Sequence, residues 1–198
     1  MSLLEHLGGV VAQQMSHSAA AKTGVDEGVA AKMLPVAMAA LMGGLKKNAS
    51  DAQGAEALAR ALDRHDGGLL NQISRVGDDD VLADGQKIVG HILGGKQGAT
   101  QLALAKAAGV DEAQVGQLLA MAAPALLGAL GRARREQGLD VAALAGLVTE
   151  EGVNAQRAAP PELGGLLGFL DQDGDGDFKD DMVAAAGKSL IGGLFGRK

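Results

Sequence analysis

The sequence contains no cysteine, no tryptophan and no tyrosine, and it has only three phenylalanines. Without cysteine the chain has no disulfide framework, no thiol nucleophile and no thiolate metal ligand. The lack of aromatic and β-branched runs disfavours strands, whereas the abundant Ala and Leu favour helices. Hydrophobic residues make up 47% and charged residues 21%, which is typical of a globular chain. We therefore expect an all-α fold whose core consists of Ala, Leu, Val, Ile and Met.

Familiar catalytic motifs are also missing. The sequence has no Gly-x-x-x-x-Gly-Lys-Ser/Thr phosphate loop, no convincing dinucleotide fingerprint and no Gly-x-Ser-x-Gly nucleophile elbow. No two of the histidines have metal-ligand spacing on one helix: His6, His17, His65 and His91. We expect no enzymatic activity. The less favoured alternative is an unrecognised hydrolase that pairs carboxylates in three dimensions.

The net charge of −6 disfavours nucleic acid as a partner, because nucleic-acid binding depends on Lys and Arg that neutralise phosphates. One basic cluster, Arg132, Arg134 and Arg135, follows a long apolar run, where cations complement the negative end of a helix. The first residues lack a basic stretch ahead of a long apolar one. We therefore expect no signal peptide and a cytoplasmic location.

The chain repeats itself once. Gly24-Val25-Asp26-Glu27 recurs as Gly109-Val110-Asp111-Glu112, and the same offset aligns several apolar residues that follow, as well as His6 with His91. One duplication is expected, and not a solenoid of many units. We divide the chain accordingly: a first helical repeat at 1–70, an acidic connection at 71–87, a second helical repeat at 88–149, a linker at 150–161 and a C-terminal segment at 162–198.

Each copy predicts the same series of helices. The short helices of the two copies are expected at Leu3–Ser16 and Gly85–Gly94, at Ala19–Lys22 and Thr100–Ala107, and at Asp51–Leu62 and Leu139–Val148. We therefore expect a duplicated multi-helix bundle made of two similar helical repeats.

The long helix of each copy has a clear start. Asp26 and Asp111 are placed to act as N-caps, and Gln114 completes a capping-box pattern in the second copy. We expect these helices to end near Gly43-Gly44 and Gly128. Because Pro35 and Pro124 lie inside them, we expect each to be kinked or divided in two.

One stretch resembles a membrane span by length. The residues from Ala113 to Gly131 carry no charge, and about 20 apolar residues suffice to cross a bilayer. The stretch nevertheless contains two glutamines and Pro124, and its counterpart in the first copy contains Lys32 and Pro35. We interpret it as a buried core helix and expect no transmembrane segment.

The acidic loop near the C-terminus is the most informative segment for function. Calcium takes six to eight oxygen ligands, and an EF-hand loop supplies them at alternate positions. Aspartates fill the first, third and fifth positions, and Gly176 fills the sixth, where the chain must turn sharply. The candidate calcium ligands are five aspartates: Asp171, Asp173, Asp175, Asp177 and Asp181.

The loop departs from the EF-hand pattern at its end. Met182 stands at the twelfth position, where a bidentate Glu belongs, so Asp181 closes the site only with altered geometry. With Leu163–Leu170 and Asp181–Leu194 as flanking helices, we predict a helix–loop–helix-like unit that binds calcium weakly, with Kd on the order of 10⁻⁵ to 10⁻³ M. The alternative is an acidic turn whose aspartates cap the next helix.

Several segments together resemble a known bacterial family rich in Ala, Leu and Gly. They are the duplicated Gly-Val-Asp-Glu helices, Leu62-Asp63-Arg64-His65-Asp66-Gly67, Val89-Gly90-His91-Ile92-Leu93-Gly94 and the terminal Leu170–Asp177 loop. The chain resembles the family catalogued as domain of unknown function 937, sometimes grouped with YidB-like proteins. The resemblance implies an all-α bacterial protein and carries no activity, substrate or catalytic residue.

The sequence therefore favours a non-enzymatic binding or scaffold protein with a calcium-binding loop, and with a protein partner or self-association. The alternative is a membrane-surface or self-assembly protein that acts through the Gly/Leu-rich end, Met182–Lys198, by peripheral membrane contact. Such an end more often packs on its own domain.

Overall fold

The computed structural model describes residues 10–65 and 67–158, and this part of the chain consists of helices joined by short turns, without a strand. The expected all-α class is confirmed. The helices are α2 (Val10–Thr23), α3 (Glu27–Asn48), α4 (Ala52–Leu62), α5 (Asp79–Leu93), α6 (Gln97–Ala108), α7 (Glu112–Gln137) and α8 (Val141–Ala158), with 3-10 helices η1 (Gly68–Gly77) and η2 (Gly94–Lys96) between them.

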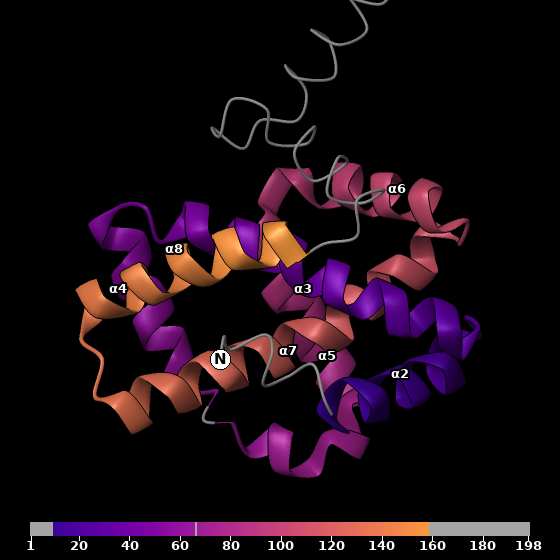
Figure 1. Ribbon diagram of the computed structural model, residues 1–198, viewed down its shortest axis with the longest axis horizontal. Helices are drawn as coiled ribbons and strands as arrows, with labels where there is room; N and C mark the ends of the chain where they lie inside the picture. Colours follow the sequence, from indigo (N-terminus) through magenta and orange to yellow (C-terminus); the bar gives the residue numbers. More distant parts are fainter. Residues whose placement is uncertain (1–9, 66, 159–198) are drawn as a thin grey trace, which may run out of the picture.

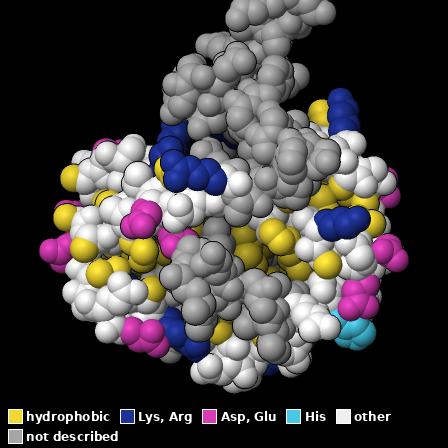
Figure 2. Space-filling view, viewed as in Figure 1, with side chains coloured by type: hydrophobic (Ala, Val, Ile, Leu, Met, Phe, Trp, Pro, Cys, Tyr) yellow, Lys and Arg dark blue, Asp and Glu magenta, His cyan; other side chains and the backbone are white. Residues whose placement is uncertain are grey.

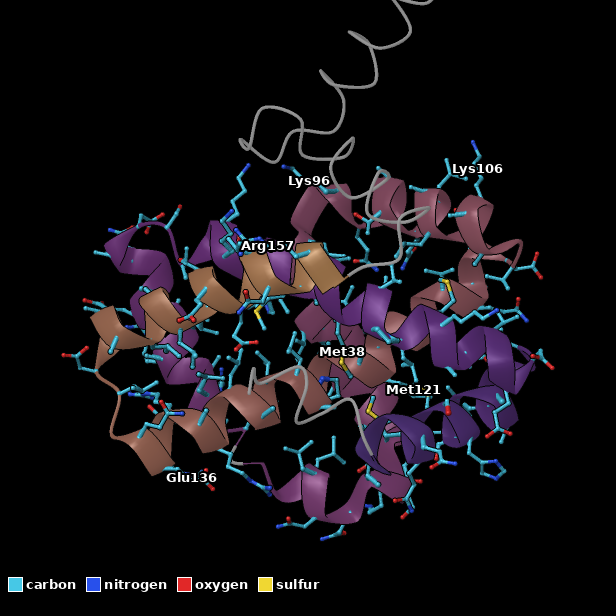
Figure 3. The ribbon with its side chains drawn as sticks, in the orientation of Figure 1. Met38, Lys96, Lys106, Met121, Glu136 and Arg157 are labelled. Atoms are coloured by element: carbon cyan, nitrogen blue, oxygen red, sulfur yellow. The ribbon has the colours of Figure 1, made fainter. Side chains whose placement is uncertain are left out.

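Two long helices, α3 and α7, form the centre of the bundle (Figure 1). Every residue of α7 from Leu118 to Gly131 is buried, because α5, α3, α6 and η1 surround it. α3 packs against α2, α7 and α8. Met38 of α3 and Met121 of α7 are buried in the core between these helices (Figure 3). A helix that is apolar on all sides is stable in water only when it is enclosed in this way.

Burial accounts for the apolar composition of these two helices. Both α3 and α7 are long and apolar enough to cross a membrane by length and composition alone. In the folded bundle, 56% of the most apolar window of α3 and 78% of that of α7 lie inside the protein. The charge-free stretch from Ala113 to Gly131 is thus a core helix, as expected.

The predicted N-caps are confirmed. The carboxylate of Asp26 accepts hydrogen bonds from the backbone N–H of Gly28 at 2.9 Å and of Val29 at 3.3 Å. At α7, the backbone N–H of Asp111 donates to Oε1 of Gln114 at 3.0 Å, which completes the capping box. The turn that leads into each long helix is called its corner. Each corner contains a glycine with a left-handed φ, +71° at Gly24 and +67° at Gly109, so the chain turns into both long helices in the same way.

The first helices differ from the expectation. α2 continues from Val10 to Thr23 without a break, whereas separate helices were expected at Leu3–Ser16 and Ala19–Lys22. No glycine or proline lies between Ser16 and Thr23, and the hydroxyl of Thr23 donates to the carbonyl of Ala19, so nothing interrupts the helix. Residues 1–9 lie outside the described part.

The prolines and internal glycines do not divide the long helices. α3 continues past Gly43-Gly44 to Asn48, and α7 continues past Gly128 to Gln137, with Pro35 and Pro124 inside them. The expected ends and breaks were wrong, because contacts on several sides of each helix offset a local cost of about 3 kcal/mol for proline. The glycines serve close packing instead: Gly44 lies against Ile92 of α5.

Two expected connections are also largely helical. In the stretch 71–87, η1 extends to Gly77 and α5 begins at Asp79, so the acidic residues belong to a helix start. α8 continues through most of the expected linker at 150–161, as far as Ala158. Gly152 packs there against the side chain of Lys46 from α3, and Ala155 is buried, which anchors the last turns of α8 to the bundle.

Candidate functional site

The predicted calcium loop lies outside the described residues. This holds for all five candidate ligands, Asp171, Asp173, Asp175, Asp177 and Asp181, and for the helices expected around them. Calcium binding therefore stays a prediction from sequence. Within residues 10–65 and 67–158, no three His, Asp or Glu side chains come together as a group that could hold a metal ion.

The aspartates at the start of α5 are held by cations. Arg75 bonds to the carboxylates of Asp78 at 3.0 Å and Asp80 at 3.2 Å. Asp79 reaches across to α2, where the ammonium of Lys22 lies 2.6 Å from Oδ1. The hydrogen bond and charge of Lys22 hold the pKa of Asp79 below its ordinary value. These contacts tie α5 to η1 and α2, so the acidic cluster has a structural use.

The basic cluster at the end of α7 is also structural. Arg134 donates from Nη1 to the carbonyl of Ala59 at 2.8 Å and to Oδ1 of Asp63 at 2.7 Å. The carbonyl of Ala59 also accepts from the backbone N–H of Asp63, so Arg134 adds a second, charged donor in the last turn of α4. The sequence argument placed these cations at a helix end. It did not reveal that Arg134 binds the end of a different helix, α4.

Arg132 and two glycines of α7 hold the loop that follows α4 against this helix. Arg132 donates from Nη2 to the carbonyl of Gly67 at 3.1 Å and to Oδ1 of Asn71 at 2.8 Å. The loop backbone lies directly on α7, since a Cβ at Gly128 would be 3.3 Å from Cα of Gly67 and a Cβ at Gly131 would clash with the carbonyl of His65. His65 and Gly67 of the Leu-Asp-Arg-His-Asp-Gly segment therefore pack against α7.

The two corners that precede the long helices contact each other. Gln114, which caps the start of α7, also donates from Nε2 to the carbonyl of Thr23 at 3.1 Å. Thr23 is buried at the end of α2, just before the equivalent corner of α3. One glutamine thus joins the two copies of the Gly-Val-Asp-Glu motif, a contact between residues 91 positions apart.

The described histidines and the buried carboxylate come from different parts of the chain. His17 lies 3.6 Å from Glu27 on an exposed surface, and His65 and His91 lie on other elements; His6 falls outside the described part. Glu151 in α8, 5% exposed, is the only carboxylate in the buried core of the described ranges, and it has an interaction partner.

A surface that the sequence did not single out lies along α6. This helix buries Thr100, Leu104 and Ala105 against the bundle, and on its outer side Leu102 is 37% exposed, the one exposed large hydrophobic side chain in the described ranges. Lys106, one turn later, points away from the bundle (Figure 3). The sequence of α6 could have indicated an exposed apolar residue, because Leu102 and Leu104 are too close together to lie on one face of a helix.

Lys106 near the end of α6 and Arg157 at the end of α8 are exposed cations (Figure 3), whereas the ammonium of Lys96, just before α6, is buried. Dark blue Lys and Arg side chains mark the upper left and upper right of the visible face (Figure 2).

Comparison with known proteins gives one match. The profile of a family described as bacterial protein of unknown function (DUF937) matches residues 5–133, which is 129 of the 198 residues. No curated protein and no solved structure matches the chain significantly.

Proposed function

The chain belongs to the DUF937 family of bacterial proteins of unknown function, and we propose from its own residues that it is a non-enzymatic binding or scaffold protein with a calcium-binding C-terminal loop. The observation that carries the proposal is the spacing of Asp171, Asp173 and Asp175 ahead of Gly176. Hard oxygen ligands at alternate positions, followed by a sharp turn, are what a calcium loop requires.

The arrangement of the core supports a scaffold role. Arg75, Arg132 and Arg134 are bonded to loops and helix ends, so these cations fix the relative positions of elements. A core organised in this way provides a stable platform to which a ligand-dependent segment can be attached. Calcium would neutralise the crowded aspartates and order the segment from Leu163 to Leu194.

Gene duplication is part of the same proposal. The two corners share a left-handed glycine and an aspartate N-cap, and each leads into a long central helix. α4 and α8 follow these long helices at equivalent places in the chain. We infer that the scaffold arose from two copies of one helical unit, whose equivalent corners still meet at Gln114 and Thr23.

The direct test is calorimetric titration of calcium into the chelator-treated full chain. We expect saturable binding of one ion with Kd on the order of 10⁻⁵ to 10⁻³ M. The variant Asp173→Ala, Asp175→Ala should bind none. As a matched control, Asp78→Ala, Asp80→Ala removes two aspartates from the Arg75 cluster and should leave calcium binding unchanged. Absence of binding by the unaltered chain at millimolar calcium contradicts the proposal.

The second candidate is a membrane-surface function of the Gly/Leu-rich end. Its support is the combination of Leu190, Ile191, Leu194 and Phe195 with the terminal cations Arg197 and Lys198. Co-sedimentation with vesicles that contain anionic lipid, lost on deletion of 187–198, would favour it. Equal sedimentation of the full and shortened chains would exclude this segment as the membrane contact.

A further inference from the structure

Residues 67–95, which include η1 and α5, have a second copy in the sequence. They align with residues 164–192 at one constant offset of 97 positions and without a gap. Eleven of the 29 aligned residues are identical, and spaced identities at one offset are typical of a repeated structural unit. The identities include Gly67-Gly68-Leu69-Leu70 with Gly164-Gly165-Leu166-Leu167, Gly77-Asp78 with Gly174-Asp175, and Asp80 with Asp177.

In the described copy, one arginine neutralises aspartates at the start of α5. Arg75 donates from Nε to Oδ2 of Asp78 at 3.0 Å and from Nη2 to Oδ2 of Asp80 at 3.2 Å. Both carboxylates lie at the N-terminal end of α5, where negative charge favours a helix but neighbouring carboxylates repel each other. The guanidinium therefore offsets the repulsion within the turn that leads into α5.

The second copy keeps these two aspartates and lacks the arginine. Gln172 stands at the place of Arg75, and Asp171 and Asp173 replace the serine and the valine on either side of it. The turn has thus gained two carboxylates and lost its cation. Another cation must offset this charge before the same turn can form, and carboxylate oxygens at alternate positions are ligands that calcium takes.

The contacts that hold the first copy against the core cannot form in the same way in the second. Val76 is fully buried, and a Cβ at Gly85 would clash with the backbone of α7. The second copy has Asp173 and Met182 at these places. A carboxylate is costly to bury, and a methionine leaves no room for so close a helix crossing. The second copy therefore depends more on its own local interactions than η1 and α5 do.

We propose that residues 164–192 form a second η1–α5 unit, in which a calcium ion bound by the loop aspartates takes the place that Arg75 has in the first. The bound ion offsets the repulsion of the carboxylates, and the helix that corresponds to α5 then forms behind them. Gln172 is the residue that makes this copy depend on a metal. The role of calcium rests on the function proposed above, whereas the repeat of the unit does not.

The variant Gln172→Arg restores the residue of the first copy and tests the proposal in the full chain. Amide hydrogen exchange, read by mass spectrometry over residues 180–190, should be slow in the unaltered chain with calcium chloride and fast with chelator. In Gln172→Arg we expect slow exchange with chelator as well. We also expect calorimetry to show a calcium Kd that is raised roughly ten-fold or more, because the guanidinium and the ion compete for the same carboxylates.

Ala184→Arg is the matched control. It adds the same charge to the same segment, at the place of Lys87, which is exposed on α5 in the first copy. We expect it to change the calcium Kd by less than about two-fold, because a distant exposed charge is largely screened. Its exchange over residues 180–190 should follow that of the unaltered chain.

The outcomes separate the two steps. Fast exchange over residues 180–190 in every state, even when calcium binds, overturns the second unit. An equal calcium Kd for Gln172→Arg and for Ala184→Arg overturns the role of Gln172 and leaves calcium binding in place. If the unaltered chain binds no calcium but Gln172→Arg shows slow exchange, the second unit stands and the calcium function proposed above is wrong.

Discussion

Gly85 lies where α5 crosses α7, and replacing it by alanine tests how the central helices are held together. A Cβ at this position would lie 2.7 Å from the carbonyl carbon of Ala120 and closer still to its oxygen. These are backbone atoms in the middle of a helix that is buried on all sides, so they cannot rotate away as a flexible side chain can. The Gly85→Ala variant must therefore push α5 away from α7, which loosens a closely packed interface.

Two effects of opposite sign determine the magnitude. Alanine stabilises an interior helical position by about 1 kcal/mol relative to glycine. Forcing an extra methyl group into a filled contact costs about 1–3 kcal/mol and sometimes more, and a backbone neighbour places this case at the upper end. We expect Gly85→Ala to lower the free energy of unfolding by about 1–2 kcal/mol, and Tm by about 2–8 °C for a chain of this size.

Gly146 provides the matched control. It lies inside α8, is exposed, and has no neighbouring atom within 4 Å of the position that a Cβ would take. Gly146→Ala should therefore raise the free energy of unfolding by about 0.5–1 kcal/mol. Thermal and urea unfolding followed by circular dichroism measure both variants. If Gly85→Ala is as stable as the unaltered chain while Gly146→Ala gains stability, the close crossing of α5 and α7 is refuted.

Two further predictions concern charged groups. Arg134→Met removes a donor to Ala59 and the partner of Asp63, and it should lower the free energy of unfolding by about 1.5–3 kcal/mol. A double-mutant cycle with Asp63→Asn should give a coupling energy of about 0.5–1 kcal/mol between the two side chains. A coupling energy of zero would mean that the pair contributes nothing to stability. Lys22 lowers the pKa of Asp79, so this pair stabilises the fold above the ordinary carboxyl pKa of about 4 and loses that effect as the pH falls further. Carboxyl NMR titration should show a higher Asp79 pKa in Lys22→Met, and an unchanged value would contradict the contact.

Local signals made the helix starts predictable. Asp26 and Asp111 act within three residues of their own positions, so short patterns in the sequence suffice to locate them. The all-α class followed from composition in the same way. The five candidate calcium ligands are also defined by local spacing, but they lie outside the described residues, so their site remains a prediction.

Helix ends and the uses of charged groups were less predictable, because they depend on contacts between distant residues. α3 continues beyond Gly43-Gly44 since Gly44 packs against α5, a contact that local propensity does not contain. Arg132 and Arg134 bond to residues 61–75 positions away, so their partners cannot be inferred from spacing. α8 extends through the expected linker for the same reason, because Gly152 meets Lys46 of α3.

Charge is distributed unevenly along the chain. The described ranges contain 14 Lys and Arg against 15 Asp and Glu, so this part of the chain is close to neutral, and the segment 162–181 carries an excess of six negative charges. Within the described part, ion pairs hold several of the charged groups in place, as at Arg75 and Arg134. The excess of carboxylates in the segment 162–181 is the charge that a bound calcium ion would lower, from −6 to −4, which is the physical reason to expect the ion there.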